Sequence, residues 1–194
     1  GDVKRGQVVL RSTAQEGDAV LVTGYPGQAA AGLKLLLSSP AEKNLKDHPL
    51  VRSYTIPSHR AWEGQAVARS GLATAKIDTS DGLLGDLGHI CEESGVGVVI
   101  FQEKLPVSQD LKSGALRLGW DPFELVLHES DDYELIITCS SENVASLRSL
   151  IVDVSNVPVS EIGRITDKAG ELRLILPNGT ERPVSPEGWD HFSR

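Results

Sequence analysis

The chain has 194 residues, enough for one large domain or two small ones with a sizeable core. Its content of 40% hydrophobic and 24% charged residues is ordinary for a soluble globular protein. The formal net charge of −8 argues against non-specific binding to nucleic acid or to anionic membranes, because both need basic patches.

The two cysteines, Cys91 and Cys139, lie at apolar-patterned positions and outside any CxxC motif. We therefore expect reduced thiols in the core of a cytoplasmic protein. The sequence contains no segment long and apolar enough to span a membrane, and no signal peptide.

Strand and helix patterns alternate in the first third of the chain. A short strand is expected at 7–11 and a second at 17–24, which the turn Gly24-Tyr25-Pro26-Gly27 ends. A helix follows from Gln28, with an apolar face expected at Ala31, Leu33, Leu35, Leu36 and Leu37. The glycine-bearing turn could hold a phosphate, but it lacks the Walker lysine spacing and a full GxGxxG. A tight crossover turn is therefore the favoured interpretation.

After a polar stretch at 40–52 and a helix expected at 62–70, residues 74–101 predict a strand, an acidic turn, a helix and a strand. The helix is indicated by one apolar stripe, and Gly95 ends it. The stripe consists of Leu83, Leu84, Leu87, Ile90 and Cys91.

The acidic turn places Asp78, Ser80 and Asp81 at the start of that helix. A helix N-terminus presents unpaired N–H groups, which carboxylates or phosphate oxygens can satisfy. Ser and Asp are also preferred caps, so the turn could be structural. Capping needs one such side chain, however, and two nearby carboxylates repel each other unless a cation lies between them. Hard oxygen ligands favour Mg²⁺, and the residues alone leave both interpretations open.

The second half of the chain also alternates helices and strands, which favours the α/β class. Helices are expected at 110–118 and from Pro122, with Asp121 as N-cap, and a strand from Tyr133 to Cys139. A helix capped by Ser140 or Ser141, a strand at 158–166 and a hairpin turning at 177–179 follow. The acidic residues before Tyr133 could be a solvated turn, and the tail residues Trp189 and Phe192 could be packed or functional.

The segment IDTSDGLLGDLGHICEESGVG at 77–97 resembles the signature of thiamine-monophosphate kinases, within the superfamily that includes aminoimidazole ribonucleotide synthetase. Further similar stretches follow the family order: LRSTAQEGDAVLVTGYPGQAAAGL at 10–33, PSHR at 57–60, DDYEL at 131–135 and GWDHF at 188–192. They correspond to the C-terminal half of the family. The resemblance implies one C-terminal domain over 1–194, with a mixed β-sheet flanked by helices. The family's N-terminal ATP- and metal-binding domain is expected to be absent from this chain.

The resemblance also implies an activity, the transfer of the γ-phosphate of ATP to thiamine monophosphate by direct, Mg²⁺-assisted transfer. It makes Asp78 and Asp81 metal ligands, and Arg11 and Ser80 ATP contacts. Asp131 and Trp189 become contacts of the substrate, where Trp189 would stack on the cationic thiamine ring. No residue is assigned as an acid, base or nucleophile, and Arg60 is left structural.

In the family the acidic turn before the strand reads GGEDYEL, whereas this chain has Glu129-Ser130-Asp131-Asp132. That difference supports one alternative, a degenerate, non-catalytic nucleotide- or thiamine-phosphate-binding module. A sister ATP-using enzyme of the superfamily is the other. A homodimer is expected to form through the absent N-terminal domain, and this chain alone is expected to be inactive.

Overall fold

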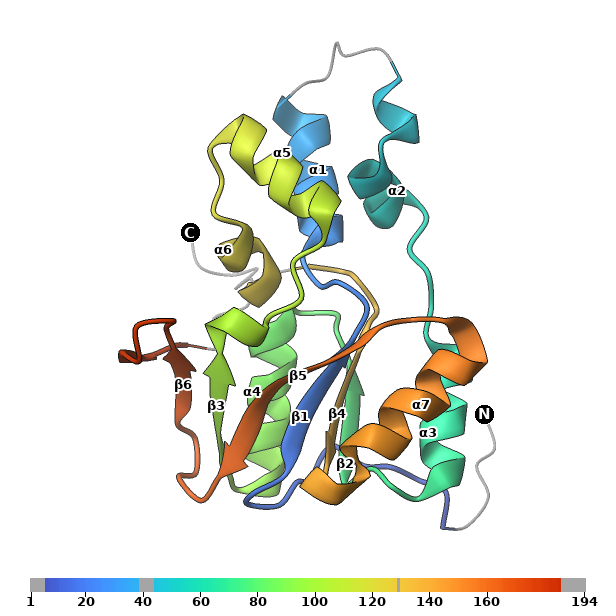
Figure 1. Cartoon of the computed structure of the whole chain (residues 1–194), viewed down its shortest axis with the longest axis vertical. Helices are drawn as coiled ribbons and strands as arrows, with labels where there is room; N and C mark the ends of the chain where they lie inside the picture. The colour runs from blue at the N-terminus through green and yellow to red at the C-terminus, as the bar shows by residue number, and fades with distance from the viewer. Residues whose placement is uncertain (1–5, 39–43, 129, 186–194) are drawn as a thin grey trace.

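The computed structural model describes residues 6–38, 44–128 and 130–185. Within them, seven strands form one mixed sheet in the order β2-β4-β1-β5-β3-β6-β7 (Figure 1). Neighbouring strands are antiparallel except for β3 and β6, which are parallel. The strands are β1 (Ala19–Thr23), β2 (Ala75–Asp78), β3 (Gly97–Phe101), β4 (Leu135–Cys139), β5 (Val159–Thr166), β6 (Leu172–Ile175) and β7 (Glu181–Pro183). The predicted mixed sheet of an α/β protein is confirmed.

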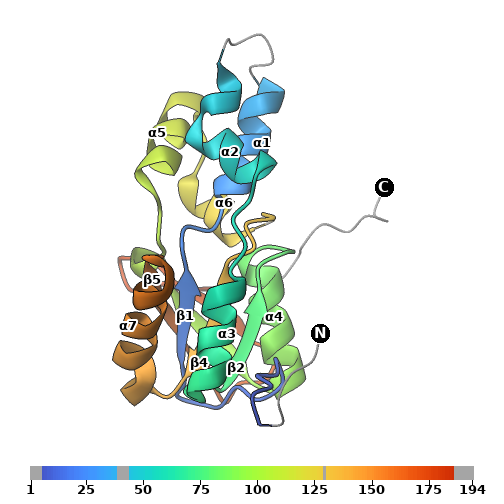
Figure 2. The same ribbon diagram turned by 90° about the vertical axis from the view of Figure 1, so that its right-hand side faces the viewer.

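Helices cover both faces of the sheet and one of its ends. Helix α4 (Leu83–Ser94) lies on one face, and α3 (Ala61–Ser70) and α7 (Val144–Ser155) lie on the other (Figure 2). The remaining α-helices form a cluster at one end: α1 (Gln28–Ser38), α2 (Pro49–Thr55), α5 (Gln109–Leu118) and α6 (Pro122–Leu127). Single 3₁₀ turns occur at η1 (Leu45–Asp47), η2 (Gln102–Lys104) and η3 (Ser141–Asn143). None of the helices in the described ranges is long and apolar enough to cross a membrane.

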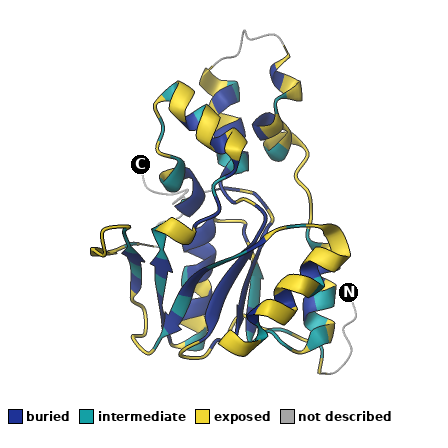
Figure 3. Cartoon of the chain, viewed as in Figure 1, coloured by how far each residue is buried: buried dark blue, intermediate teal, exposed yellow. Residues whose placement is uncertain are grey.

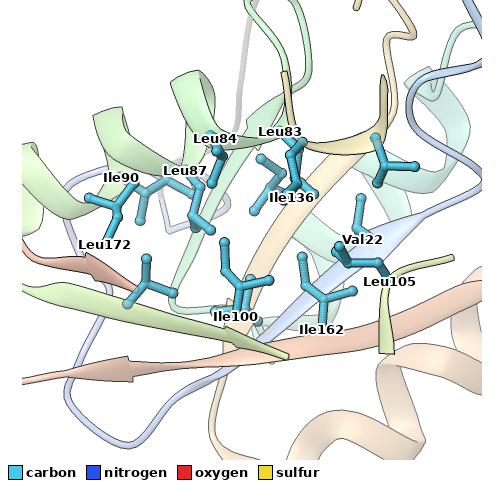
Figure 4. Close-up of a cluster of buried hydrophobic side chains, with 14 of the residues drawn as sticks. Val22, Leu83, Leu84, Leu87, Ile90, Ile100, Leu105, Ile136, Ile162 and Leu172 are labelled. Atoms are coloured by element: carbon cyan, nitrogen blue, oxygen red, sulfur yellow. The ribbon is translucent and has the colours of Figure 1, made fainter. Parts of the chain in front are cut away.

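The alternation of side chains along β1 explains why the sheet has a core on each face. Val20 and Val22 point to the α4 side, whereas Ala19 and Leu21 point to the side of α3 and α7. The central strands β1 and β4 are accordingly buried along their whole length (Figure 3), whereas the edge strand β7 is exposed. The predicted stripe of α4 is confirmed, since all five of its residues are at most 1% exposed and face the strands (Figure 4).

Both cysteines lie in these cores as free thiols, as predicted. Burial raises the pKa of the Cys91 thiol to about 12. For Cys139, burial and then the charges of Asp18 and Glu161 raise the pKa to about 11. Both side chains therefore stay protonated and unreactive at neutral pH.

Three local predictions were wrong. Residues 7–11 form no strand: the Leu10 carbonyl accepts one hydrogen bond, from the backbone N–H of Lys76 at the edge of β2. Val8 and Leu10 find no face to bury against and remain 57% and 51% exposed. Neither Ser140 nor Ser141 caps α7, because η3 precedes that helix and its N-cap is Asn143.

The apolar face predicted for α1 is the third, and it is wrong in part: Ala31 and Leu35 are buried as predicted, but Leu33 and Leu37 are not. Leu37 is 73% exposed and Leu33 is 37% exposed, whereas the small residues Ala29, Ala31 and Gly32 are buried. The reason is the close approach of α2, since a Cβ atom on Gly32 would lie 2.1 Å from the Leu50 carbonyl oxygen. The small side chains therefore face α2, and Leu33 and Leu37 are left on the surface.

Candidate functional site

The acidic turn between β2 and α4 is held by a residue that the sequence analysis did not single out. One oxygen of Asp86, Oδ2, accepts hydrogen bonds from the backbone N–H groups of Ser80 (2.8 Å) and Asp81 (2.9 Å). Asp86 is 2% exposed, and its burial raises the pKa of the carboxyl more than these two hydrogen bonds lower it. Asp86 thus holds the turn without help from the carboxylate of Asp81, which caps no helix N–H group and is 64% exposed.

A possible cation site forms around Asp81. Ligand atoms of Asp81, Asp86 and His89 lie within 4.8 Å of one another, with Asp81 Oδ2 3.8 Å from His89 Nε2. Two carboxylates with one imidazole can bind a divalent cation, and the carboxylate oxygens suit Mg²⁺. This donor set therefore fits the metal that the resemblance implies.

Asp78 is not part of this group. It pairs with Leu135 in the sheet, and its side chain points to the α3 face together with that of Lys76. The structure therefore does not bring Asp78 and Asp81 around one ion. A metal-ligand role for Asp78 stays a prediction.

Three of the predicted site residues line one cleft of about 1110 Å³: Ser80, Asp81 and Asp131. This main cleft runs from the acidic turn along α4 to Glu92, and its other walls come from Ser130 and Asp131, from α1 with Tyr54 of α2, and from Gly170 and Leu172. Its carboxylates come from Asp81, Glu92 and Asp131, while Leu33, Leu37 and Tyr54 form an apolar wall. The exposed Leu33 and Leu37 of α1 therefore line the main cleft.

The 130–134 turn caps α1. The carboxylate of Asp132 accepts hydrogen bonds from the backbone N–H groups of Gly27 (2.5 Å) and Ala29 (2.8 Å), and Ser130 Oγ accepts one from Ala30 (3.1 Å). Burial raises the pKa of Asp132 more than these contacts lower it. The glycine-bearing turn therefore has no free N–H groups to offer a phosphate at these positions, which agrees with the favoured crossover interpretation.

A buried ion pair lies beneath the same turn. Arg60 donates from Nε (2.6 Å) and Nη2 (2.5 Å) to the two oxygens of Glu134, and the Thr23 hydroxyl donates to the same carboxylate at 2.6 Å. A Cβ atom on Gly24 would lie 2.0 Å from Glu134 Oε1, so a glycine is needed there. Burial lowers the pKa of Arg60, but the hydrogen bonds and charge of Glu134 outweigh it and raise the pKa. The structural role expected for Arg60 is thus the anchoring of β4 to the chain before α3.

Arg11 does not line the main cleft. Its Nε is 2.5 Å from Glu93 Oε1, and its carbonyl accepts a hydrogen bond from Ser94 Oγ, so it sits at the C-terminal end of α4. Twelve helical residues, about 18 Å, separate that end from Ser80. The structure does not bring these two expected ATP contacts together, and Trp189 lies outside the described residues.

Comparisons with known proteins assign the chain to one family. The family model described as AIR synthase related protein, C-terminal domain, matches residues 15–175. Thiamine-monophosphate kinase of Aquifex aeolicus (strain VF5) is 33% identical over 95% of this chain and 55% of the relative. The enzyme of Escherichia coli (strain K12) is 36% identical over 100% of this chain and 58% of the relative. The chain thus spans little more than half the length of these relatives.

Solved structures agree with this assignment. The thiamine-monophosphate kinase from Stenotrophomonas maltophilia K279a has a TM-score of 0.78 at 32% identity, covering 90% of this chain and 54% of that one. A structure described as AaThiL complexed with AMPPCP and TMP also has a TM-score of 0.78, at 33% identity over 95% of this chain and 54% of that one. The hydrogenase maturation protein HypE of E. coli, at 19% identity and a TM-score of 0.75 over 95% of this chain and 54% of that one, shares the fold alone.

Proposed function

This chain belongs to the family of AIR synthase related C-terminal domains, and we propose that it forms part of a thiamine-monophosphate kinase. The complete enzyme would transfer the γ-phosphate of ATP to thiamine monophosphate and release thiamine diphosphate and ADP. The observation that carries the proposal is the gathering of Ser80, Asp81 and Asp131 in the main cleft, within a chain similar to such kinases along nearly its whole length. We also propose that the complete enzyme is cytoplasmic and dimerises through a domain outside this chain.

The side chains of the main cleft suit positioning more than acid–base chemistry. The Ser80 hydroxyl can donate a hydrogen bond to a phosphate oxygen, and the apolar wall of Leu33, Leu37 and Tyr54 can exclude water from one side of a bound ligand. Phosphoryl transfer depends mainly on alignment and charge stabilisation, so a cleft without a dedicated base is consistent with it.

The charge of the main cleft makes a divalent cation necessary for this function. Among its described lining residues, Asp81, Glu92 and Asp131 are acidic and Lys34 is the one lysine or arginine. Such a surface repels a nucleoside triphosphate that has no cation bound to it. Asp81, with Asp86 and His89, would hold Mg²⁺, and the ion would neutralise phosphate charge when bound.

The test is Asp81→Asn in the complete enzyme. We expect kcat to fall by about a hundredfold or more, with unchanged thermal stability, because charge stabilisation is the main source of catalysis here. The matched control is Asp153→Asn on the exposed face of α7, which should leave turnover unchanged. Near-normal turnover of Asp81→Asn, with the same Mg²⁺ dependence, would show that Asp81 has no metal role. Binding of both ligands by the wild type without turnover would instead favour a non-catalytic binding module.

A further inference from the structure

A second cavity, of about 440 Å³, lies on the other side of the 130–134 turn. It is bounded by α2, by the chain that runs from α2 to α3 (Figure 1) and by the start of β4, and we call it the α2 cavity. Among the described residues, none that lines the α2 cavity also lines the main cleft. The lining residues that matter for its chemistry are Tyr25, Arg52, Ser58, Arg60, Asp132 and Glu134.

The two carboxylates of the α2 cavity are already fully engaged. Glu134 accepts two hydrogen bonds from Arg60 and one from Thr23, and Asp132 accepts from two backbone N–H groups at the start of α1. Glu134 is 5% exposed and Asp132 is 9% exposed. Arg60 therefore compensates the charge of Glu134, while backbone N–H groups satisfy both oxygens of Asp132 as acceptors, so neither carboxylate needs a ligand.

The positive groups of the α2 cavity are not fully used. Arg52 lies in the last turn of α2, and its guanidinium has no ion-pair or hydrogen-bond partner in the part of the chain that the structure describes. Arg60 donates hydrogen bonds from Nε and Nη2 to Glu134, and its Nη1 has no acceptor among the described side chains. The ion pair fixes the Arg60 guanidinium in the wall, so its remaining N–H donors need little reordering before they bind an anion.

From this arrangement we propose that the α2 cavity binds the phosphate group of a small phosphate ester. Guanidinium groups match the geometry of phosphate oxygens, and the hydroxyls of Tyr25 and Ser58 add donors for a third oxygen. A carboxylate has two oxygens and would leave one of these donors unused. The volume lies within the range typical of small-molecule sites, and Ile56 and Pro57 offer apolar contact to the rest of the ester. The proposal is independent of the kinase function.

Titration of the ¹⁵N-labelled chain with inorganic phosphate, at constant ionic strength, tests the proposal. We expect saturable shifts of the backbone amides of Ser53, Ser58 and Arg60 that report one common affinity. Arg52→Ala should weaken this affinity by about tenfold or more, while Arg52→Lys should lose less because the charge remains. The matched control is Arg148→Ala, another exposed arginine, on α7, which should bind phosphate like the wild type.

Acetate at the same concentrations should produce shifts that saturate at least about tenfold more weakly than those of phosphate. The proposal is overturned if phosphate gives no saturable shift at these amides, or if it shifts only residues of the main cleft such as Ser80 and His89. Unchanged affinity in Arg52→Ala, or equal binding of acetate and phosphate, would also overturn it. Arg52 is exposed, so its variants should fold, and their denaturation midpoints check this.

Discussion

At the scale of single residues, Asp86 holds the acidic turn, but its burial makes the ionised form of its carboxyl less favourable. Burial raises the pKa of its carboxyl above the ordinary value of 3.8, despite hydrogen bonds from Asp81 and Ser80. Between the unfolded and folded pKa values the folded state binds more protons than the unfolded state. The free energy of unfolding contributed by this group is therefore highest below 3.8 and falls as pH rises toward the folded pKa.

Asp86→Asn tests this linkage, because an amide oxygen can accept the same two hydrogen bonds without a charge. The free energy of unfolding of the wild type should fall relative to the variant as pH rises from about 4 to about 7. Urea denaturation of both proteins at several pH values measures this difference. Parallel pH profiles for the two proteins would mean that Asp86 does not titrate as described.

Sequence reasoning found the site residues that are close together along the chain. Ser80 and Asp81 stand out because they begin an amphipathic helix, and Asp131 entered through resemblance to a family. Asp86 lies in the first turn of the same helix and His89 three residues later, so a search of that helix for neighbours of Asp81 could have found both. The sequence around Tyr54 gives no indication that this residue lines the main cleft, since its position there depends on how α2 packs against α1.

At the scale of elements, the Arg60–Glu134 pair joins β4 to the segment before α3. The two side chains are 14% and 7% exposed, so Arg60→Met would leave the Glu134 carboxylate buried without its partner. Such a change typically costs about 3–5 kcal/mol, and denaturant unfolding should show a loss of that order. In the double variant Arg60→Met with Glu134→Met, the loss should be smaller than in Arg60→Met alone.

Arg173 provides the control for this pair. It bonds to Glu171 and Glu181 on the exposed surface of β6 and β7, with 38% of its side chain exposed. Because water solvates and screens these charges, Arg173→Met should change stability little. Equal losses for Arg60→Met and Arg173→Met would show that the buried pair contributes no more than a surface contact.

Two glycines around Leu50 test how α1 packs on α2. A Cβ atom on Gly32 would lie 2.1 Å from the Leu50 backbone oxygen, whereas one on Gly114 would lie 3.0 Å from the Leu50 Cδ1 atom. Backbone cannot move aside without separating the helices, but a side-chain methyl can turn away. Gly32→Ala should therefore destabilise the protein by about 1–3 kcal/mol in denaturant unfolding.

Gly114→Ala, in contrast, should cost little, because alanine favours a helix over glycine by up to about 1 kcal/mol. If both variants lost the same stability, the close contact of Gly32 with α2 would not be limiting. The same contact explains why the apolar pattern of α1 misled the prediction of its buried face. Hydrophobicity locates a helix, but its packing partner decides which side is buried.

At the scale of the whole molecule, the strand order places the functional turns together. Because β1 and β2 are both antiparallel to β4, the ends of β1 and β2 and the start of β4 meet at one end of the sheet. That end faces the cluster of α1, α2, α5 and α6. The α/β class and most elements were predictable from residue patterns, but this order was not, since pairs such as Thr23–Glu134 join residues 111 positions apart.

We expect this chain by itself to have no kinase activity. A site for ATP and a second phosphate compound has to compensate several negative charges at once, and phosphoryl transfer depends on those charges acting together. The described lining of the main cleft offers one lysine against three carboxylates, and Arg11 is engaged with Glu93 at the far end of α4. Even with a cation at Asp81, these groups are too few to hold both ligands in line.

The measurement is an assay for thiamine diphosphate after incubation of the chain with ATP, Mg²⁺ and thiamine monophosphate. Product should not exceed that of a protein-free control, although the chain should unfold cooperatively, since it has a hydrophobic core on each face of its sheet. The complete enzyme at equal concentration is the positive control. Turnover by this chain that disappears in Asp81→Asn would show that the main cleft is a complete active site, and that the charges described here suffice for catalysis.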